Sequence, residues 1–217
     1  MQLIERHTES LDWLTLLFVG CIVVYGLTKY LFPRRFQEFI ALPLSNKYFL
    51  VQGRNEEIQH PFNMLLFVTQ IISFSVFIYL VTKTAIPDEI ATNKWIFVQI
   101  ISGYTFFILT KYFVEKIIGT VFSMDSLINR YLYQKLSYRN LIAILVLVAN
   151  LFFVYVFAPS LTLLLIFAVL LLVLNCIALF YSYKTNGKLI LGNFFYFILY
   201  LCALEISPYI IIYKALT

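Results

Sequence analysis

The 217-residue chain is 62% hydrophobic and only 12% charged, whereas a soluble domain is about half apolar and about a quarter charged. This composition excludes an ordinary soluble protein, and long apolar runs without strand-like alternation predict an all-α membrane protein rather than a β-barrel. The formal net charge of +5 is explained by the side of the membrane on which the basic loops lie, so nucleic acid is not an expected partner.

We expect about six transmembrane helices, because roughly 20 consecutive apolar residues are needed to cross the hydrocarbon core of a bilayer. In chain order they are Trp13–Leu31, Phe62–Val81, Trp95–Tyr112, Leu141–Phe157, Leu161–Tyr181 and Phe194–Tyr213. The short turn Ala158-Pro159-Ser160 predicts that the fourth and fifth spans form an antiparallel hairpin. The predicted fold is therefore a polytopic membrane helix bundle, with residues 1–217 forming a single transmembrane domain.

An amphipathic segment, residues 117–136, lies between the third and fourth spans. Its apolar residues recur at roughly helical spacing: Ile117, Val121, Leu127, Ile128, Tyr131, Leu132 and Leu136. Its polar side is basic: Lys116, Arg130, Lys135 and Arg139. Two interpretations stay open. The segment is either one or two helices lying at the membrane interface, or an ordinary connector packed on other helices.

The distribution of basic residues predicts the orientation in the membrane. Twelve of the 16 Lys and Arg residues lie in or beside the loops that follow the first, third and fifth spans, counting Lys29 and Lys111 at the ends of the first and third spans, and four fall elsewhere. Cytoplasmic loops carry an excess of Lys and Arg. We therefore expect a multi-pass protein of the bacterial inner (cytoplasmic) membrane with both termini in the periplasm.

Glu205 is the one acid or base that the sequence places well inside a predicted span, in the stretch LYLCALEISPYIII. A charge at the bilayer centre costs roughly 2.5–3.5 kcal/mol on insertion scales, so we expect the carboxyl to be protonated and to face protein. Pro208 lacks an N–H and frees a backbone carbonyl one turn back. Tyr209 shares the helical face of Glu205.

A hydrogen bond between Glu205 and a neighbouring span is the favoured hypothesis for this residue. Asn150 in the fourth span and Glu205 lie at similar depths, about 11 and 12 Å below the outer surface, so a contact between them is possible. A structural bond between helices or to a partner protein is preferred over the alternative, a proton-relay or cation site.

The first cytoplasmic loop contains a second candidate site, made of Arg54, Glu56, Glu57 and His60. One His and two adjacent Glu residues at arbitrary spacing are not enough to make a metal site. We therefore expect a structured loop or partner-binding surface there, and neither a metal nor another cofactor. His60-Pro61 marks the entry to the second span.

Two long segments resemble a known but uncharacterised family. They are NKYFLVQGRNEEIQHPFNMLLFVTQIISFSVFIY and FFYFILYLCALEISPYIIIYK. They look like a domain-of-unknown-function group of multi-spanning inner-membrane proteins typical of Bacteroidota, with Leu204-Glu205-x-x-Pro208 as the most recognisable element. The resemblance covers nearly the whole chain. It implies an inner-membrane location and a non-enzymatic role, but it brings no activity and does not explain Glu205.

We expect an accessory, assembly or scaffold subunit of a larger envelope complex, without catalysis of its own. The 22 Phe and 16 Tyr residues provide large surfaces for helix packing, so the expected partners are the lipid bilayer and other membrane proteins or a second copy. One alternative is a small transporter or proton-conducting component centred on Glu205. Another is a lipid-modifying enzyme that uses Arg54, Glu57 and His60.

Overall fold

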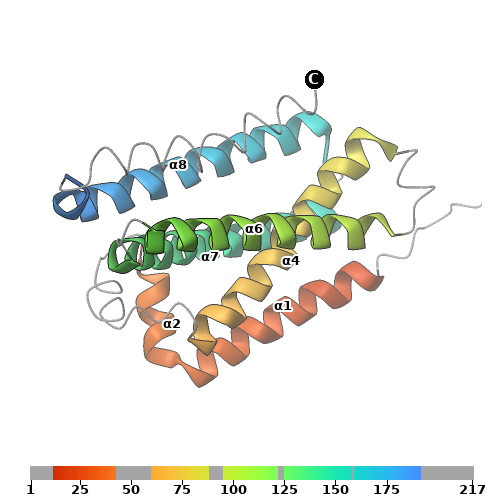
Figure 1. Cartoon of the computed structure of the whole chain (residues 1–217). Coiled ribbons are helices and arrows are strands. Elements are labelled where there is room, and N and C mark those ends of the chain that lie inside the picture. Colours follow the sequence, from red (N-terminus) through yellow and green to blue (C-terminus); the bar gives the residue numbers. More distant parts are fainter. Residues whose placement is uncertain (1–11, 43–59, 88–94, 122–124, 158, 192–217) are drawn as a thin grey trace, which may run out of the picture.

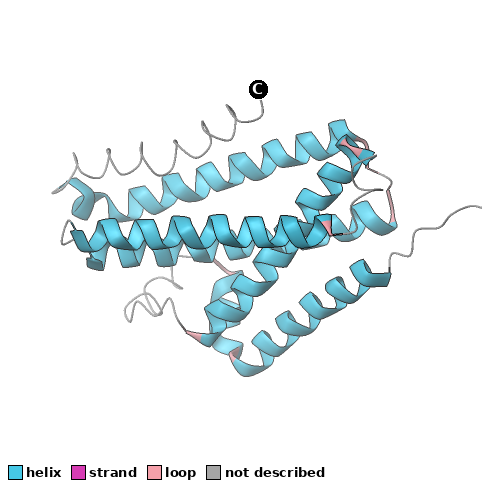
Figure 2. Cartoon of the chain, turned by 45° about the vertical axis from the view of Figure 1, so that its right-hand side comes forward, coloured by secondary structure: helices cyan, strands magenta, loops and turns pink. Residues whose placement is uncertain are grey.

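The computed structural model describes residues 12–42, 60–87, 95–121, 125–157 and 159–191, with the backbone alone for 126–127 and 179–191. These residues form six helices and no strand (Figures 1 and 2). The helices are α1 (Asp12–Leu31), α2 (Pro33–Ile40), α4 (Pro61–Ala85), α6 (Ile96–Val121), α7 (Asp125–Tyr155) and α8 (Leu161–Leu191).

Five stretches in these helices are long and apolar enough to cross a membrane, and they lie in α1, α4, α6, α7 and α8. The expectation of an all-α membrane helix bundle is confirmed. Each of the first five predicted spans falls within one of these helices, except that the third begins one residue before α6 and the fourth ends two residues after α7. The sixth predicted span, Phe194–Tyr213, lies outside the described residues.

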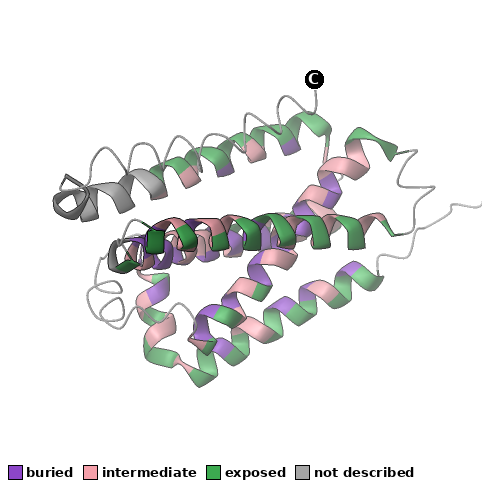
Figure 3. Cartoon of the chain, in the orientation of Figure 1, coloured by how far each residue is buried: buried purple, intermediate pink, exposed green. Residues whose placement is uncertain are grey.

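Helix α4 is the centre of the bundle and crosses it obliquely (Figure 1). It packs against α1, α6, α7 and α8. In its most apolar stretch 56% of the residues are buried, against 6% in α6 and 11% in α8. Figure 3 shows the same contrast, with buried residues along α4 and mainly exposed ones on α8. The exposed apolar faces of α6 and α8 are those that a bilayer would cover.

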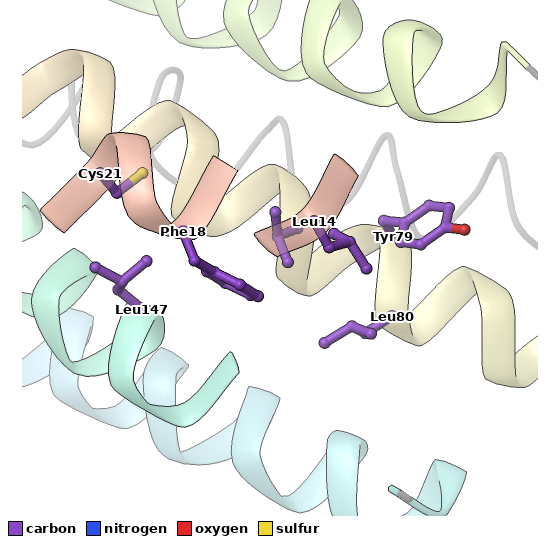
Figure 4. Packing of buried hydrophobic residues seen from close by; sticks show 7 residues of the cluster. Leu14, Phe18, Cys21, Tyr79, Leu80 and Leu147 are labelled. Atoms are coloured by element: carbon purple, nitrogen blue, oxygen red, sulfur yellow. The ribbon is translucent and has the colours of Figure 1, made fainter. Parts of the chain in front are cut away.

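The core that joins α1 to the bundle is a cluster of buried apolar side chains (Figure 4). Its members are Leu14, Phe18 and Cys21 from α1, Val76, Tyr79 and Leu80 from α4, and Leu147 from α7. A second cluster joins α8 to α4 and α7 and consists of Phe77, Ile142, Val146, Leu164 and Leu171. Lipid tails are as apolar as these side chains, so close packing rather than escape from water holds such helices together.

Helix α2 follows α1 directly and ties the first loop region to the bundle. Pro33 stands in its first turn, where the missing N–H leaves no helical hydrogen bond unmade. Phe39 is fully buried and packs in one cluster with Phe62 of α4 and Tyr133 of α7. The end of α1, the start of α4 and the first turns of α7 are therefore at the same end of the bundle.

The amphipathic segment between the third and fourth spans has no separate helix. Instead, α6 runs on to Val121 and α7 begins at Asp125. The buried Ile128, Tyr131 and Leu132 agree with a connector packed on other helices. The helices α6 and α7 extend into this segment for a physical reason. Lys and Arg are good helix formers, so basic residues end the apolar span without ending the helix.

Candidate functional site

A pocket of about 340 Å³ lies between α4, α6 and α7, towards the end of the bundle where α6 finishes and α7 starts. Most of its wall is apolar, and the apolar lining residues are Met64, Phe67, Ile108, Leu109, Phe113, Leu132 and Leu136. The remaining lining residues are Lys111, Tyr112, Glu115, Lys135 and Arg139. Of the described residues, three cations and one carboxylate therefore line a mostly apolar pocket.

The carboxylate of the pocket is held in an ion pair between α6 and α7. The Nζ of Lys135 lies 2.6 Å from Oε1 of Glu115, and the two side chains are only 13% and 2% exposed. Lys135 also lies over the ring of Tyr131, 5.4 Å from its centroid, at a distance where the ring attracts a cation. Removing one partner of such a buried pair leaves the other charge uncompensated, which is strongly destabilising.

Glu115 is buried because of its position on α6. Ile108, Glu115 and Gly119 are the buried residues of this helix, and their spacing places them on one face. Gly119 allows α7 to come close, since a Cβ added there would meet the Cβ and Cγ1 of Ile128 at 3.1 Å. The close approach of the two helices brings the carboxylate of Glu115 within reach of Lys135.

Two further hydrogen bonds fasten the end of α6 to the start of α7. Lys116 donates from Nζ to Oδ1 of Asn129 at 2.8 Å. The hydroxyl of Thr120 donates to Oδ1 of Asp125, also at 2.8 Å. The α6–α7 wall of the pocket is thus held by polar contacts on both sides of the closely packed Gly119.

Arg139 lines the pocket and also carries a buried donor that is not satisfied within the structure. Its Nε is buried and has no hydrogen-bond partner, a condition that costs free energy when it persists. A guanidinium binds carboxylates and phosphates through paired N–H donors. With Lys111 lining the same pocket, the arrangement can bind an anion that carries an apolar body.

Asn150, which the sequence analysis singled out, is fully buried between helices. Its Nδ2 donates to the backbone oxygen of Ser73 in α4 at 2.8 Å, while its Oδ1 is buried without a hydrogen-bond partner. The amide therefore links α7 to α4. Glu205, Pro208 and Tyr209 lie outside the described residues, so a Glu205–Asn150 contact stays a prediction.

His60 is the one member of the first-loop set that the structure describes. Its Nδ1 accepts the backbone N–H of Phe62 at 3.1 Å, which caps the N-terminus of α4. Its ring packs edge-on against Phe32 at 5.1 Å. Arg54, Glu56 and Glu57 lie outside the described ranges, so the proposed loop site stays a prediction. Among the residues that the structure describes, no group of three or more His, Cys, Asp or Glu could hold a metal ion.

The pocket was not predicted from the sequence. The pattern of the amphipathic segment places Lys135 and Arg139 on its polar side, and it does not point to Glu115. The available signal was the helical spacing of Ile108, Glu115 and Gly119, which places a carboxylate on a face with an apolar residue and a glycine. The residues that meet this face come from α7 and α4, and only the fold brings them there.

The fold and the pocket together define a helical membrane protein with a charged, partly enclosed pocket at one end. Residues 14–216 match the model of DUF4271, described as a domain of unknown function. The chain belongs to this family, and the resemblance to an uncharacterised family is confirmed. No curated protein and no solved structure matches the chain.

Proposed function

We propose that this protein is a multi-spanning protein of the bacterial inner membrane that binds an anionic lipid in the pocket between α4, α6 and α7. One observation carries the proposal: among the described residues, the pocket combines apolar walls with three cations and one carboxylate. An anionic lipid brings both the negative charge and the apolar body that such a pocket accommodates.

The position of the pocket in the membrane supports a lipid head group as its occupant. The basic residues Arg34 and Arg35 lie in α2, which packs at the same end of the bundle as Tyr133 of α7. The excess of Lys and Arg at this end favours the cytoplasmic side, which puts both termini in the periplasm. Anionic lipids of the cytoplasmic leaflet are attracted to such basic surfaces.

The outer edge of the pocket favours a lipid over a small soluble anion. Three of its apolar lining residues are largely exposed: Met64 at 55%, Leu109 at 38% and Phe113 at 58%. In a bilayer these side chains face acyl chains. A lipid could therefore place its head group beside Arg139 and extend its chains along this apolar edge.

Binding rather than chemistry is proposed because the carboxylate that lines the pocket is already engaged by Lys135. A general base needs a carboxylate that can accept a substrate proton. The expected role as an accessory or assembly subunit of a larger complex is compatible with lipid binding and stays a prediction. The transporter and enzyme alternatives depend on Glu205 and Arg54, outside the described residues.

Lipid retention by the purified full-length protein tests this proposal. After mild detergent extraction, native mass spectrometry should detect a co-purified anionic lipid on the wild type. Replacing Arg139 with Gln removes a charged donor, and its loss should lower retention roughly tenfold. Arg34→Gln is the matched control, because Arg34 is exposed on α2 and does not line the pocket. Equal anionic-lipid retention by the wild type and both variants would contradict the proposal.

A further inference from the structure

Three helices carry an amphipathic aromatic residue at the end of the bundle opposite the pocket. Trp13 stands in the first turn of α1, Trp95 directly precedes α6 and Tyr155 ends α7. The ring of Trp13 lies 4.8 Å from that of Phe97, and the hydroxyls of Thr15 and Tyr155 share a hydrogen bond of 2.6 Å. The three aromatic residues are therefore at one level of the bundle, which we call the aromatic level.

The rings of the aromatic level are accessible to the surrounding lipid. Trp13 is 37% exposed, Tyr155 is 51% exposed and Trp95 is 70% exposed. Trp and Tyr are enriched at the boundary between hydrocarbon and water, because such rings have an apolar body and a polar group. The aromatic level therefore marks one surface of the hydrocarbon core of the bilayer.

The same three helices each carry a cation sixteen positions from the aromatic residue. The pairs are Trp13 and Lys29 for α1, Trp95 and Lys111 for α6, and Tyr155 and Arg139 for α7. No charged residue lies between the members of any pair, and at 1.5 Å per residue each pair spans about 24 Å. Lys111 and Arg139 line the same pocket, so the cations also share a level, the basic level.

The distance between the two levels is short for a membrane protein. It is about 24 Å, whereas the hydrocarbon core of a typical bilayer is about 30 Å thick. A charge inside hydrocarbon is costly, and a long stem relieves this cost by extending to the interface. Helical side chains leave the backbone towards the helix N-terminus, which is the aromatic end of α1 and α6. Lys29 and Lys111 therefore start towards the bilayer centre, which limits that relief.

We propose that this protein thins the bilayer around it, so that its preferred surroundings are lipids with short acyl chains. Helices α1 and α6 are those that lipid must match, since only 22% and 6% of their apolar stretches are buried. Residues 61–82 of α4 and 161–183 of α8 are longer uncharged stretches. They do not oppose a thin core, because a long span can tilt, as α4 does (Figure 1), whereas a short span draws the lipid surfaces together.

The experiment places the full-length protein in vesicles of dimyristoleoyl, dioleoyl or dierucoyl phosphatidylcholine, which form progressively thicker bilayers, and measures thermal unfolding. These vesicles contain no anionic lipid, so the result does not depend on lipid binding in the pocket. We expect the unfolding temperature to be highest in the dimyristoleoyl lipid and lower by at least about 5 °C in the dierucoyl lipid. An unfolding temperature that is highest in the dioleoyl or dierucoyl lipid would overturn the inference.

Lys29→Leu tests the basic level without altering the pocket, since Lys29 is exposed and does not line it. The substitution lengthens the uncharged stretch of α1. The fall in unfolding temperature between the thinnest and thickest bilayers should therefore shrink by about a third, because one of three short pairs is removed. Arg34→Leu is the matched control: it removes an exposed cation from α2, outside the pairs, and should leave the fall unchanged. An equal fall in the wild type and Lys29→Leu would contradict the basic level as its cause.

Fluorescence measures the aromatic level directly, because Trp13 and Trp95 are the only two tryptophans of the chain. Phosphatidylcholines with bromine at different depths quench a tryptophan best when the bromine lies at the depth of the ring. We expect stronger quenching by bromine near the head groups than by bromine near the chain ends. The reverse order would place the aromatic level inside the hydrocarbon, and the inference would then be wrong.

Discussion

The two buried polar regions of this bundle are built from different kinds of side chain. At the α6–α7 end the polar groups are ions, and Glu115 and Lys135 satisfy one another across the two helices. Between α4 and α7 they are neutral amides. The side-chain nitrogen and oxygen of both Gln70 and Asn140 are buried without a hydrogen-bond partner. Asn150 donates a hydrogen bond through Nδ2, whereas its Oδ1 has no partner. A buried charge without a partner is far more costly in lipid than an amide, which accounts for the pairing of Glu115 with Lys135.

The largest effect on stability should come from breaking the Glu115–Lys135 ion pair. Glu115→Leu leaves Lys135 buried without its counter-ion, so we expect the free energy of unfolding to fall by about 3–5 kcal/mol. Thermal unfolding of the protein in detergent measures the loss. The double variant Glu115→Leu/Lys135→Leu should recover most of it, since an apolar pair replaces a buried ion pair at little cost. A double variant as unstable as the single one would show that the two residues act independently.

The close approach of α6 and α7 underlies the ionic region, and Gly119→Val tests it. The new Cβ would meet the Cβ and Cγ1 of Ile128 at 3.1 Å, and a Cβ cannot move unless its helix moves. Overpacking of this kind costs about 1–3 kcal/mol. Gly103→Val is the control, because nothing lies within 4 Å of a Cβ at that position.

A rescue variant separates overpacking from other effects of the valine. Ile128→Ala removes the Cγ1 that the valine meets. The Gly119→Val substitution should therefore cost less in the Ile128→Ala background than in the wild type, as thermal unfolding of both pairs would show. An identical cost in the two backgrounds would mean that the contact with the Cγ1 of Ile128 is not the cause.

Between α4 and α7, the hydrogen bond made by Asn150 should contribute less to the free energy of unfolding than the Glu115–Lys135 ion pair. Asn150→Leu removes the hydrogen bond from Nδ2 to the Ser73 oxygen, and hydrogen bonds between membrane helices contribute about 0.6–2 kcal/mol. Asn175→Leu is a suitable control, since Asn175 donates to the Leu171 oxygen of its own helix. If both variants unfold at the same temperature, the Asn150 bond does not hold α7 to α4.

The sequence was sufficient for the spans because bilayer thickness dictates their length, and five of them lie in helices of the structure with at most two residues outside at an end. The sequence did not predict the helix ends or the existence of α2, since hydropathy indicates contact with lipid and not where a helix stops. Asn150 links α7 to α4 through its side-chain amide, whereas the contact with Glu205 that its depth predicts involves a residue outside the described ranges. The Glu115–Lys135 pair could not be predicted, because it depends on how closely α6 and α7 approach at Gly119.

The smallest effect is expected at Gln70, and it sharpens the contrast with Asn150. Both amide atoms of Gln70 are buried without a hydrogen-bond partner, so Gln70→Met removes polar atoms that stabilise nothing while keeping nearly the same shape. Replacing an unsatisfied polar group by an apolar one of similar size is neutral or stabilising, and the unfolding free energy should change by less than about 0.5 kcal/mol or rise.

A loss at Gln70 as large as that of Asn150→Leu would overturn this expectation. It would mean that the Gln70 amide is bonded in the membrane-embedded protein, by water or by another polar group. The Gln70 amide would then resemble the Glu115–Lys135 pair in having its polar groups satisfied. Thermal unfolding of Gln70→Met and Asn150→Leu, measured side by side in the same detergent, decides between a dry interface and a hydrated one.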